Sequence, residues 1–253
     1  GKVEADFPVM AHLPFVMGTD NAKLSKRNGE VSIAWYRERG FLPEAICNYL
    51  ALLGWSPGDD VENITMDQLV ELFTVERVHS SPARFDMKKL EAINGDKIRL
   101  LTVDDLTYRI VPFLKRDNVI TGSAQEIEVV KSAVPIIQER IATLAEASAM
   151  LKFLFVKNFE VDSDEAPKLK EEQAQSVLKK ALEVLEPLDD WRHDVIEAVL
   201  RSALLEGMGL KPRIAFGSVR VAVTGSHISP PLFESMALLG KERSIARLKQ
   251  GIL

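Results

Sequence analysis

The sequence contains a single cysteine, Cys47, so the 253-residue chain has no internal disulfide framework. A chain without disulfides fits a reducing compartment, and we expect a cytoplasmic protein. The four histidines lie too far apart to form a metal-ligand pattern, so we expect no structural metal. No apolar run reaches the roughly 18 residues of a membrane span, and we expect no membrane association. These absences exclude disulfide-stapled, zinc-finger and membrane-spanning classes.

The first residues carry no basic stretch followed by an apolar one, so a secretory signal peptide is not expected. The sequence starts at Gly1 rather than at Met. We expect Gly1 to be a boundary or a processed start.

The composition is that of an ordinary globular protein, with 46% hydrophobic and 27% charged residues. The net charge of −5 at first argues against nucleic acid as a partner. Salt screening confines a charge to about 8–10 Å, so local charge matters more than the total. Residues 211–253 hold seven basic and two acidic side chains, whereas residues 157–206 hold seven basic and thirteen acidic ones. This polarity permits a phosphate-binding face near the end of the chain.

The hydrophobic pattern predicts a mainly α-helical chain after a short strand over residues 11–17. Pro43 can open a helix that Gly54 ends, and within that helix we expect Cys47 to be a small buried hydrophobe. The segments that start at Thr65 and Ser123 both match the capping box of a helix start.

The helix that begins at Ser123 is expected to run to Ile141, with Pro135 bending or dividing it. An amphipathic pattern predicts another helix over residues 176–188. Residues 219–225 alternate like a strand, although a short extended link fits equally well. Further helices are expected over residues 192–207, 231–240 and 241–249.

The segment Lys23-Leu24-Ser25-Lys26-Arg27 places three cations within five residues, after a predicted strand and before a predicted helix. Three neighbouring cations cannot all point into a core, so the loop must face water or an anion. A solvated basic loop is the ordinary interpretation of such a cluster, but the strand–loop–helix setting favours an anion.

This segment resembles the Lys-Met-Ser-Lys-Ser signature of class I aminoacyl-tRNA synthetases, in a form common among glutamyl enzymes. The similarity continues in order along nearly the whole chain, through His12-Leu13-Pro14 and residues 40–45, 48–55, 80–90, 221–225, 229–234 and 239–243. The sequence is therefore similar to the carboxy-terminal portion of a bacterial-type glutamyl-tRNA synthetase.

The resemblance implies a fold class and a domain order. We expect a mainly α chain that begins with the tail of a class I nucleotide-binding domain. Residues 1–30 would end the catalytic domain with its signature loop, and residues 31–100 would form a stem-contact module. Two helical anticodon-binding modules would follow, over residues 101–160 and 161–253.

The resemblance also implies the chemistry. Glutamate would attack the α-phosphate of ATP, supplied with Mg²⁺ as a substrate, and the adenylate would then esterify tRNA(Glu). Lys26 would be the catalytic cation, within an ATP-binding segment made of Lys23, Leu24, Ser25, Lys26 and Arg27. We find no His-Ile-Gly-His type motif, so we expect that this segment alone does not activate glutamate and holds no cofactor.

Six further residues are expected to bind tRNA, because Arg can grip phosphates and stack on splayed bases. They are Arg84, Lys88, Arg140, Arg213, Arg220 and Thr224. Each could instead be an ordinary surface or structural residue. We expect a monomer.

Two alternatives stay open at this point. The acidic total and the acidic 157–206 region also fit a non-catalytic helical scaffold that binds protein partners. Within the family, some relatives charge both glutamate and glutamine tRNAs, and the sequence does not choose between them. The few strand patterns argue against the β-barrels expected in bacterial glutaminyl enzymes.

Overall fold

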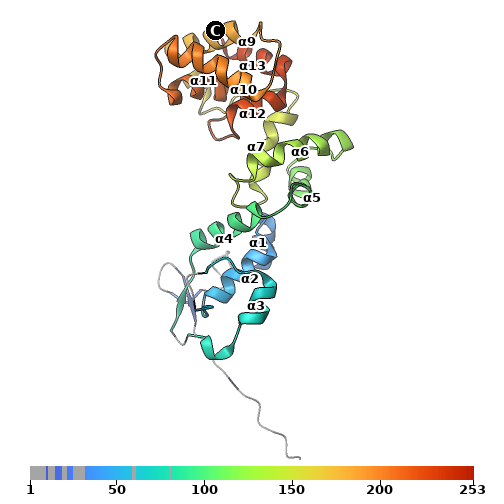
Figure 1. Cartoon of the computed structure of the whole chain (residues 1–253), viewed down its shortest axis with the longest axis vertical. Helices are drawn as coiled ribbons and strands as arrows, with labels where there is room; N and C mark the ends of the chain where they lie inside the picture. Colours follow the sequence, from blue (N-terminus) through green and yellow to red (C-terminus); the bar gives the residue numbers. More distant parts are fainter. Residues whose placement is uncertain (1–9, 11–14, 19–21, 25–31, 59–60, 80) are drawn as a thin grey trace, which may run out of the picture. The chain divides into compact units, whose positions relative to one another are not determined.

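The computed structural model describes residues 10, 15–18, 22–24, 32–58, 61–79 and 81–253. The chain divides into two compact units, residues 1–100 and residues 101–253. Helices dominate both units, which confirms the prediction of a mainly α-helical chain (Figure 1).

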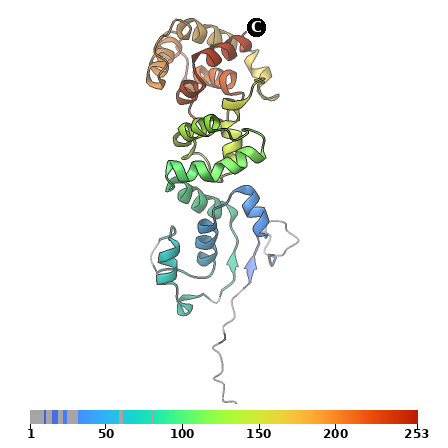
Figure 2. The same ribbon diagram turned by 90° about the vertical axis from the view of Figure 1, so that its right-hand side faces the viewer.

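The first unit sets a short parallel sheet beside several helices (Figure 2). Its elements are β1 (Val16–Met17), α1 (Ile33–Arg39), α2 (Pro43–Leu52), α3 (Met66–Leu72), η2 (Val75–Arg77), β2 (Ala83–Arg84) and α4 (Met87–Arg99). β1 and β2 run parallel, so they need a long crossover connection, and α1, α2, α3 and η2 supply it. α2 packs against both α3 and α4.

Buried amides fix the loops of the first unit. The Asn48 side chain donates to the Glu62 carbonyl at 3.0 Å and accepts from the Ile64 amide at 2.9 Å. Asn94 on α4 accepts from the Leu42 amide at 2.7 Å, just before α2 begins. Both amides are buried and hydrogen-bonded, so they serve the fold rather than a ligand.

The second unit is helical throughout (Figure 1). Its elements are α5 (Val103–Arg116), α6 (Ala124–Ile137), α7 (Glu146–Phe155), α8 (Ala166–Leu169), α9 (Glu172–Leu185), α10 (His193–Leu200), η3 (Arg201–Glu206), α11 (Pro212–Thr224), α12 (Leu232–Leu239) and α13 (Lys241–Gly251). α5 packs against α6 and α7, whereas α9 packs against α10, α11 and α13. α12 contacts α6, so the two groups of helices meet there.

Three of the helix starts predicted from the sequence are confirmed. Pro43 occupies the first turn of α2. Thr65 and Gln68 form a reciprocal capping box at α3, and Ser123 and Glu126 form another at α6. Each of these caps is formed by residues within one helical turn, so it does not depend on tertiary packing.

The possible strand over residues 219–225 is wrong, because this segment is the last two turns of α11. Pro212 lies in the first turn of that helix, and Gly225 ends it with a φ of 88° in the left-handed region. A short alternating run cannot distinguish a strand from a helix buried on most of its sides. The five residues from Val221 to Gly225 are all buried, so this end of the helix has no polar face that would reveal a helical period.

The expectation of a buried Cys47 is also wrong, since its side chain is exposed. The buried residues of α2 are Ala45, Asn48 and Tyr49. Successive residues of an α-helix turn by about 100°, which places Cys47 on the opposite side from these three.

Two helix ends differ from the predicted ones. α6 ends at Ile137, so Ile141 lies outside it, and exposed Pro135 stays within its last turn without dividing it. On a solvent-facing side, water can take the carbonyl that a proline leaves unpaired. The amphipathic helix predicted over residues 176–188 is α9, which begins four residues earlier and ends at Leu185.

Candidate nucleic-acid interface

The first part of the signature segment lies against β1. The Leu24 amide donates to the Val16 carbonyl at 2.9 Å, and Lys23 forms an antiparallel bridge with Met17. The Lys23 ammonium lies 3.9 Å from the centre of the Phe15 ring, and both side chains are exposed. The predicted site residues Ser25, Lys26 and Arg27 lie outside the described residues.

Arg84 lies on the opposite side of β1, in β2, where it pairs with Met17. Directly paired residues project from the same face of a sheet. Lys23 and Arg84 therefore share one face, two strand spacings or about 10 Å apart. The sheet brings together one residue predicted to bind ATP and one predicted to bind tRNA.

A hydrogen-bonded corner supports Arg84 and its neighbour Lys88, which is exposed on the first turn of α4. Asp86 caps α4 by accepting from the Lys89 amide at 3.2 Å. The Asp86 amide in turn donates to the Tyr49 hydroxyl at 2.6 Å. Burial raises the pKa of Tyr49, so this hydroxyl stays neutral at physiological pH.

In the second unit, Arg140 lies near enough to Arg220 for its positive charge to lower the pKa of Arg220. Arg140 is exposed in the turn after α6, and Arg220 is half-buried on α11. Burial lowers the pKa of Arg220, and the positive charge of Arg140 lowers it further, while Glu234 acts in the opposite direction. Two like charges held near each other favour an anion between or beside them.

Arg220 is oriented by the loop that follows α11. Its Nη1 donates to the Ser229 hydroxyl at 2.9 Å and to the Pro230 carbonyl at 2.6 Å. A guanidinium has five N–H donors, so these two bonds leave others for a ligand. Sequence reasoning singled out neither Ser229 nor Pro230 as a partner of Arg220.

Thr224 is buried and serves the same loop. Its hydroxyl lies 2.8 Å from the Arg220 carbonyl and 2.9 Å from the Ser226 carbonyl. A Cβ at the next residue, Gly225, would lie 3.1 Å from the Glu160 carbonyl. The turn after α11 therefore fits closely against the segment before α8.

Arg213 lies exposed in the first turn of α11. It precedes Arg220 by seven residues, which is two helical turns or about 10 Å along the same side. The predicted tRNA-binding residues of the second unit therefore lie on or beside α11.

Sequence reasoning missed a buried carboxylate that anchors the 226–230 loop. Glu165 is buried, and its carboxylate accepts from His227 of this loop and from Lys168 at 3.1 Å. Burial acts to raise the pKa of Glu165, but the bonds from Lys168 and His227 hold it below its ordinary value. Glu165 and His227 are 62 positions apart, so no local pattern signals the contact.

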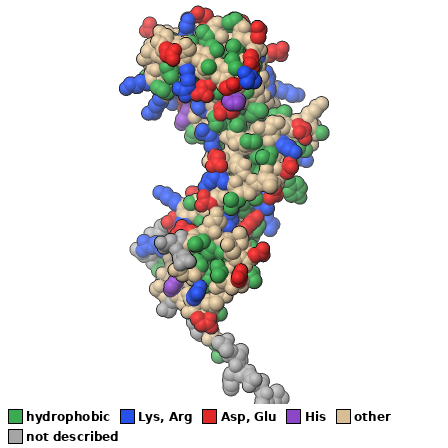
Figure 3. Space-filling view, viewed as in Figure 1, with side chains coloured by type: hydrophobic (Ala, Val, Ile, Leu, Met, Phe, Trp, Pro, Cys, Tyr) green, Lys and Arg blue, Asp and Glu red, His purple; other side chains and the backbone are tan. Residues whose placement is uncertain are grey.

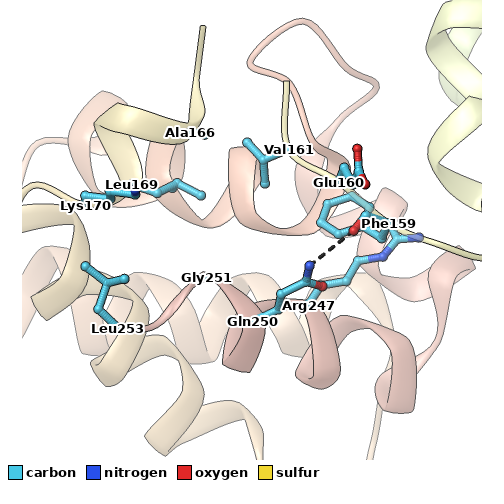
Figure 4. Close-up of a pocket in the computed structure, with 10 residues that line it drawn as sticks. All are labelled: Phe159, Glu160, Val161, Ala166, Leu169, Lys170, Arg247, Gln250, Gly251 and Leu253. Atoms are coloured by element: carbon cyan, nitrogen blue, oxygen red, sulfur yellow. Dashed lines mark hydrogen bonds between the residues drawn. The ribbon is translucent and has the colours of Figure 1, made fainter. Parts of the chain in front are cut away.

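A cavity of about 360 Å³ lies at the end of α13, beside α8 (Figure 4). Its walls include Phe159, Leu169 and Arg247, and none of the predicted tRNA-binding residues lines it. Within the described residues, no group of His, Cys, Asp and Glu is arranged to hold a metal ion. No helix in this part of the chain is both long enough and apolar enough to cross a bilayer.

Basic and acidic side chains are interspersed over both units in the view of Figure 3. The predicted RNA contacts are therefore individual cations set on particular elements. Arg220 is the clearest example, because the Ser229 hydroxyl and the Pro230 carbonyl hold its guanidinium in place.

Two protein-family models match the chain in sequence order. Residues 2–92 match the catalytic domain of class I tRNA synthetases for glutamate and glutamine. Residues 105–252 match the anticodon binding domain, and this match covers more than half of the chain.

Curated relatives show the same relationship. The chain is 49% identical to a glutamate–tRNA ligase of Arthrobacter sp. (strain FB24) over 97% of its length and 49% of the relative. It is 47% identical to a glutamate–tRNA ligase of Saccharopolyspora erythraea over 96% of its length and 49% of the relative. The chain thus spans about half the length of the curated relatives it matches.

Solved structures agree with the sequence matches. The fold superimposes on a glutamate tRNA ligase from Elizabethkingia meningosepticum with a TM-score of 0.78 and 25% identity, over 97% of this chain and 51% of that one. The glutamate-tRNA synthetase of Elizabethkingia anophelis gives 0.77 and 26%, over 98% and 51%. The chain therefore belongs to the class I glutamyl-tRNA synthetase family and joins the end of a catalytic domain to an anticodon-binding domain.

Proposed function

We propose that this chain is the tRNA-binding part of a glutamate–tRNA ligase. The whole enzyme would activate glutamate with ATP and transfer it to tRNA(Glu). The observation that carries the proposal is the Arg220 guanidinium, which Ser229 and Pro230 hold in place within the unit that matches the anticodon-binding family. Arg220, with Arg140 beside it, would offer planar donors to the bases and phosphates of an RNA loop.

Each of the expected modules has its own proposed role. Residues 1–30 would end the catalytic domain, and residues 31–100 would contact the tRNA stem through Arg84 and Lys88. Residues 101–160 and 161–253 would be the two anticodon-binding modules. Arg140 would act from the first of these modules and Arg220 from the second.

The proposed recognition uses planar guanidinium groups. Arg220 is held by Ser229 and Pro230, so it can present its remaining donors to a splayed base or phosphate with little loss of entropy. Arg213 would add a phosphate contact along α11. Thr224 faces inward, and it would act by holding the turn that carries the 226–230 loop.

The proposed chemistry places Lys26 at the leaving pyrophosphate. Negative charge moves onto that group as the glutamate carboxylate attacks the α-phosphate, so a cation placed there stabilises the transition state most. Lys23 would assist from the edge of β1, with Leu24, Ser25 and Arg27 completing the ATP-binding segment. Mg²⁺ would arrive with ATP as part of the substrate. We expect the reaction in the cytoplasm, carried out by a monomer.

Binding of a tRNA(Glu) transcript to the purified chain tests the proposal. Phosphate contacts release counterions, so the logarithm of affinity should fall steeply and linearly with the logarithm of salt concentration. Arg140→Ala should weaken binding about tenfold, which corresponds to about 1.4 kcal/mol. Lys180→Ala is the matched control, because Lys180 pairs with Glu183 on the surface of α9.

Two results would contradict the proposal. One is the absence of tRNA binding at low salt together with binding of a protein partner, which would favour a protein-binding scaffold. The other is binding that neither Arg140→Ala nor Arg220→Ala alters. Comparing transcripts of tRNA(Glu) and tRNA(Gln) would show which tRNAs this chain accepts.

A further inference from the structure

One guanidinium joins α11, which carries Arg220, to α7. Arg247 on α13 donates from Nη1 to the Val223 carbonyl at 2.6 Å and from Nη2 to the Phe153 carbonyl at 2.7 Å. Val223 lies in the last turn of α11, and Phe153 lies in the last turn of α7. Arg247 therefore bridges the C-terminal ends of both helices.

These carbonyls need such a donor. The last four carbonyls of an α-helix have no partner within the helix, and a buried unpaired carbonyl costs free energy. The amides that follow the two helices bond further back, Val156 to the Lys152 carbonyl and Gly225 to the Val221 carbonyl. Arg247 thus satisfies acceptors that their own helices leave open.

Arg243, one turn earlier on α13, strengthens the same junction. Its Nη1 donates to the Leu154 carbonyl at 2.7 Å, and its Nε donates to the Leu239 carbonyl at 3.0 Å. α13 therefore holds the end of α7 with two guanidinium groups.

The surroundings of Arg247 hold its charged side chain in one position. It is 5% exposed, and its guanidinium lies 3.9 Å from the centre of the Phe159 ring (Figure 4). The two carbonyls that it contacts lie at the negative ends of α11 and α7, which favour a cation. Burial and the charge of Arg243 lower the pKa of Arg247 to about 10, so it stays protonated at neutral pH.

The bridge connects the proposed RNA contacts. Arg220 precedes Val223 by three residues on α11, so its position follows that helix. Arg140 follows the end of α6, where its amide donates to the Ile137 carbonyl, and α6 packs against α7, so its position depends on α7 through α6. Any shift between α7 and α11 would change the separation of the two arginines.

We propose that Arg247 is a positioning residue for RNA recognition: by bridging Phe153 of α7 and Val223 of α11, it fixes Arg140 and Arg220 at the separation that an RNA loop requires. This inference rests on the proposed function. A lysine cannot replace the bridge, because an ammonium is a point charge without the planar fork that reaches two carbonyls in fixed directions.

The test compares Arg247→Lys and Arg247→Gln with the parent 253-residue chain. Circular dichroism first establishes that each variant is folded. We expect tRNA(Glu) affinity to fall about tenfold, equal to about 1.4 kcal/mol. Lys249→Gln is the control, since Lys249 lies on the same helix but makes a surface pair with Glu186 at 2.6 Å. It should stay within about twofold of the parent, as expected for an exposed pair.

A double-mutant cycle separates positioning from simple loss of stability. If Arg247 acts through the RNA-binding arginines, Arg140→Ala should cost much less affinity in the Arg247→Gln background than in the parent. The inference would be overturned if the folded double variant lost affinity by the product of the two single-variant losses.

A measurement without RNA adds an independent readout. Spin labels at Gln125 on α6 and Lys179 on α9, both exposed, would report the distance between the two groups of helices in a Cys47→Ser background. We expect a narrow distance distribution in the parent and a broader one in Arg247→Lys. If Arg247→Gln fails to fold, this comparison still decides the inference.

The outcomes distinguish the two proposals. A parent that binds tRNA through Arg140, combined with Arg247 variants of unchanged affinity and unchanged distance distribution, overturns the positioning role alone. A parent that binds no tRNA overturns the proposed function, and the positioning role with it.

Discussion

Lys23 and Arg84 pair with the same residue, Met17, from opposite edges of β1. Because paired residues share a face, the sheet sets the two cations side by side at about 10 Å. One belongs to the predicted ATP-binding segment and the other to the block predicted to contact tRNA. In the whole enzyme, this short sheet would therefore connect phosphate binding with tRNA binding.

Arg84 provides the first prediction. Arg84→Ala should weaken tRNA binding at every salt concentration and reduce the slope of log affinity against log salt by about one, as loss of one phosphate contact does. Titrations at several salt concentrations measure both quantities. Lys89→Ala is a suitable control, because Lys89 already pairs with Glu62. An unchanged slope for Arg84→Ala would show that Arg84 contacts no phosphate.

Lys26 provides the second prediction, which needs the full-length enzyme. Lys26→Ala should raise the barrier of glutamate activation by roughly 2.7–4 kcal/mol, by analogy with the loss of one transition-state donor. ATP–pyrophosphate exchange measures this step. A rate within about twofold of the parent would contradict the catalytic role, since tenfold already corresponds to about 1.4 kcal/mol. The 253-residue chain alone should form no glutamyl-adenylate.

Gly207 gives a prediction about stability. It follows the π-helical turn η3, and a Cβ there would lie 2.6 Å from the Ala203 carbonyl. Gly207→Ala should therefore destabilise the chain by about 1–3 kcal/mol, the usual cost of overpacking. Gly217 on α11 is the matched control, because its Cβ would meet nothing within 4 Å. Gly217→Ala should stabilise the chain by about 0.4–1 kcal/mol. Urea unfolding of both variants measures the difference, and equal effects would contradict the steric argument.

Glu126 gives a prediction about pH. Hydrogen bonds from Thr121, and then from Ser123 and Gly122, lower the pKa of this exposed carboxylate from 4.5 to about 2. Since the folded-state pKa is depressed, the stabilisation is present above pH 4.5 and is lost as the pH falls towards 2. The difference in melting temperature between the parent and Glu126→Gln should shrink across that window. A difference that stays constant from pH 6 to pH 3 would contradict it.

The local elements of this fold could be predicted from the sequence because their signals are local. The capping boxes at Thr65 and Ser123 and the proline at the start of α2 depend only on neighbours within one turn. Burial was harder to predict. Cys47 was placed in the core because its neighbours are apolar, yet the 100° step of the helix turns it to solvent.

For the candidate site too, the residues could be predicted from the sequence but their arrangement could not. Lys23, Arg140 and Arg220 could be named from the sequence, since their types and settings suit phosphate and RNA. Their relationships could not, because Arg140 and Arg220 are 80 positions apart and their segments meet only through the packing of α6 on α12 and of α12 on α11.

The sequence by itself determined the helical class, several helix starts, the signature segment and the family to which they point. Only the tertiary structure decided that residues 219–224 are helical, that Lys23 and Arg84 share a sheet face, and that Arg247 bridges α7 to α11. The physical reason is the separation along the sequence over which each interaction acts. Caps and periodicity act within a few residues, whereas paired strands and buried guanidinium groups join segments that only the packed chain brings together.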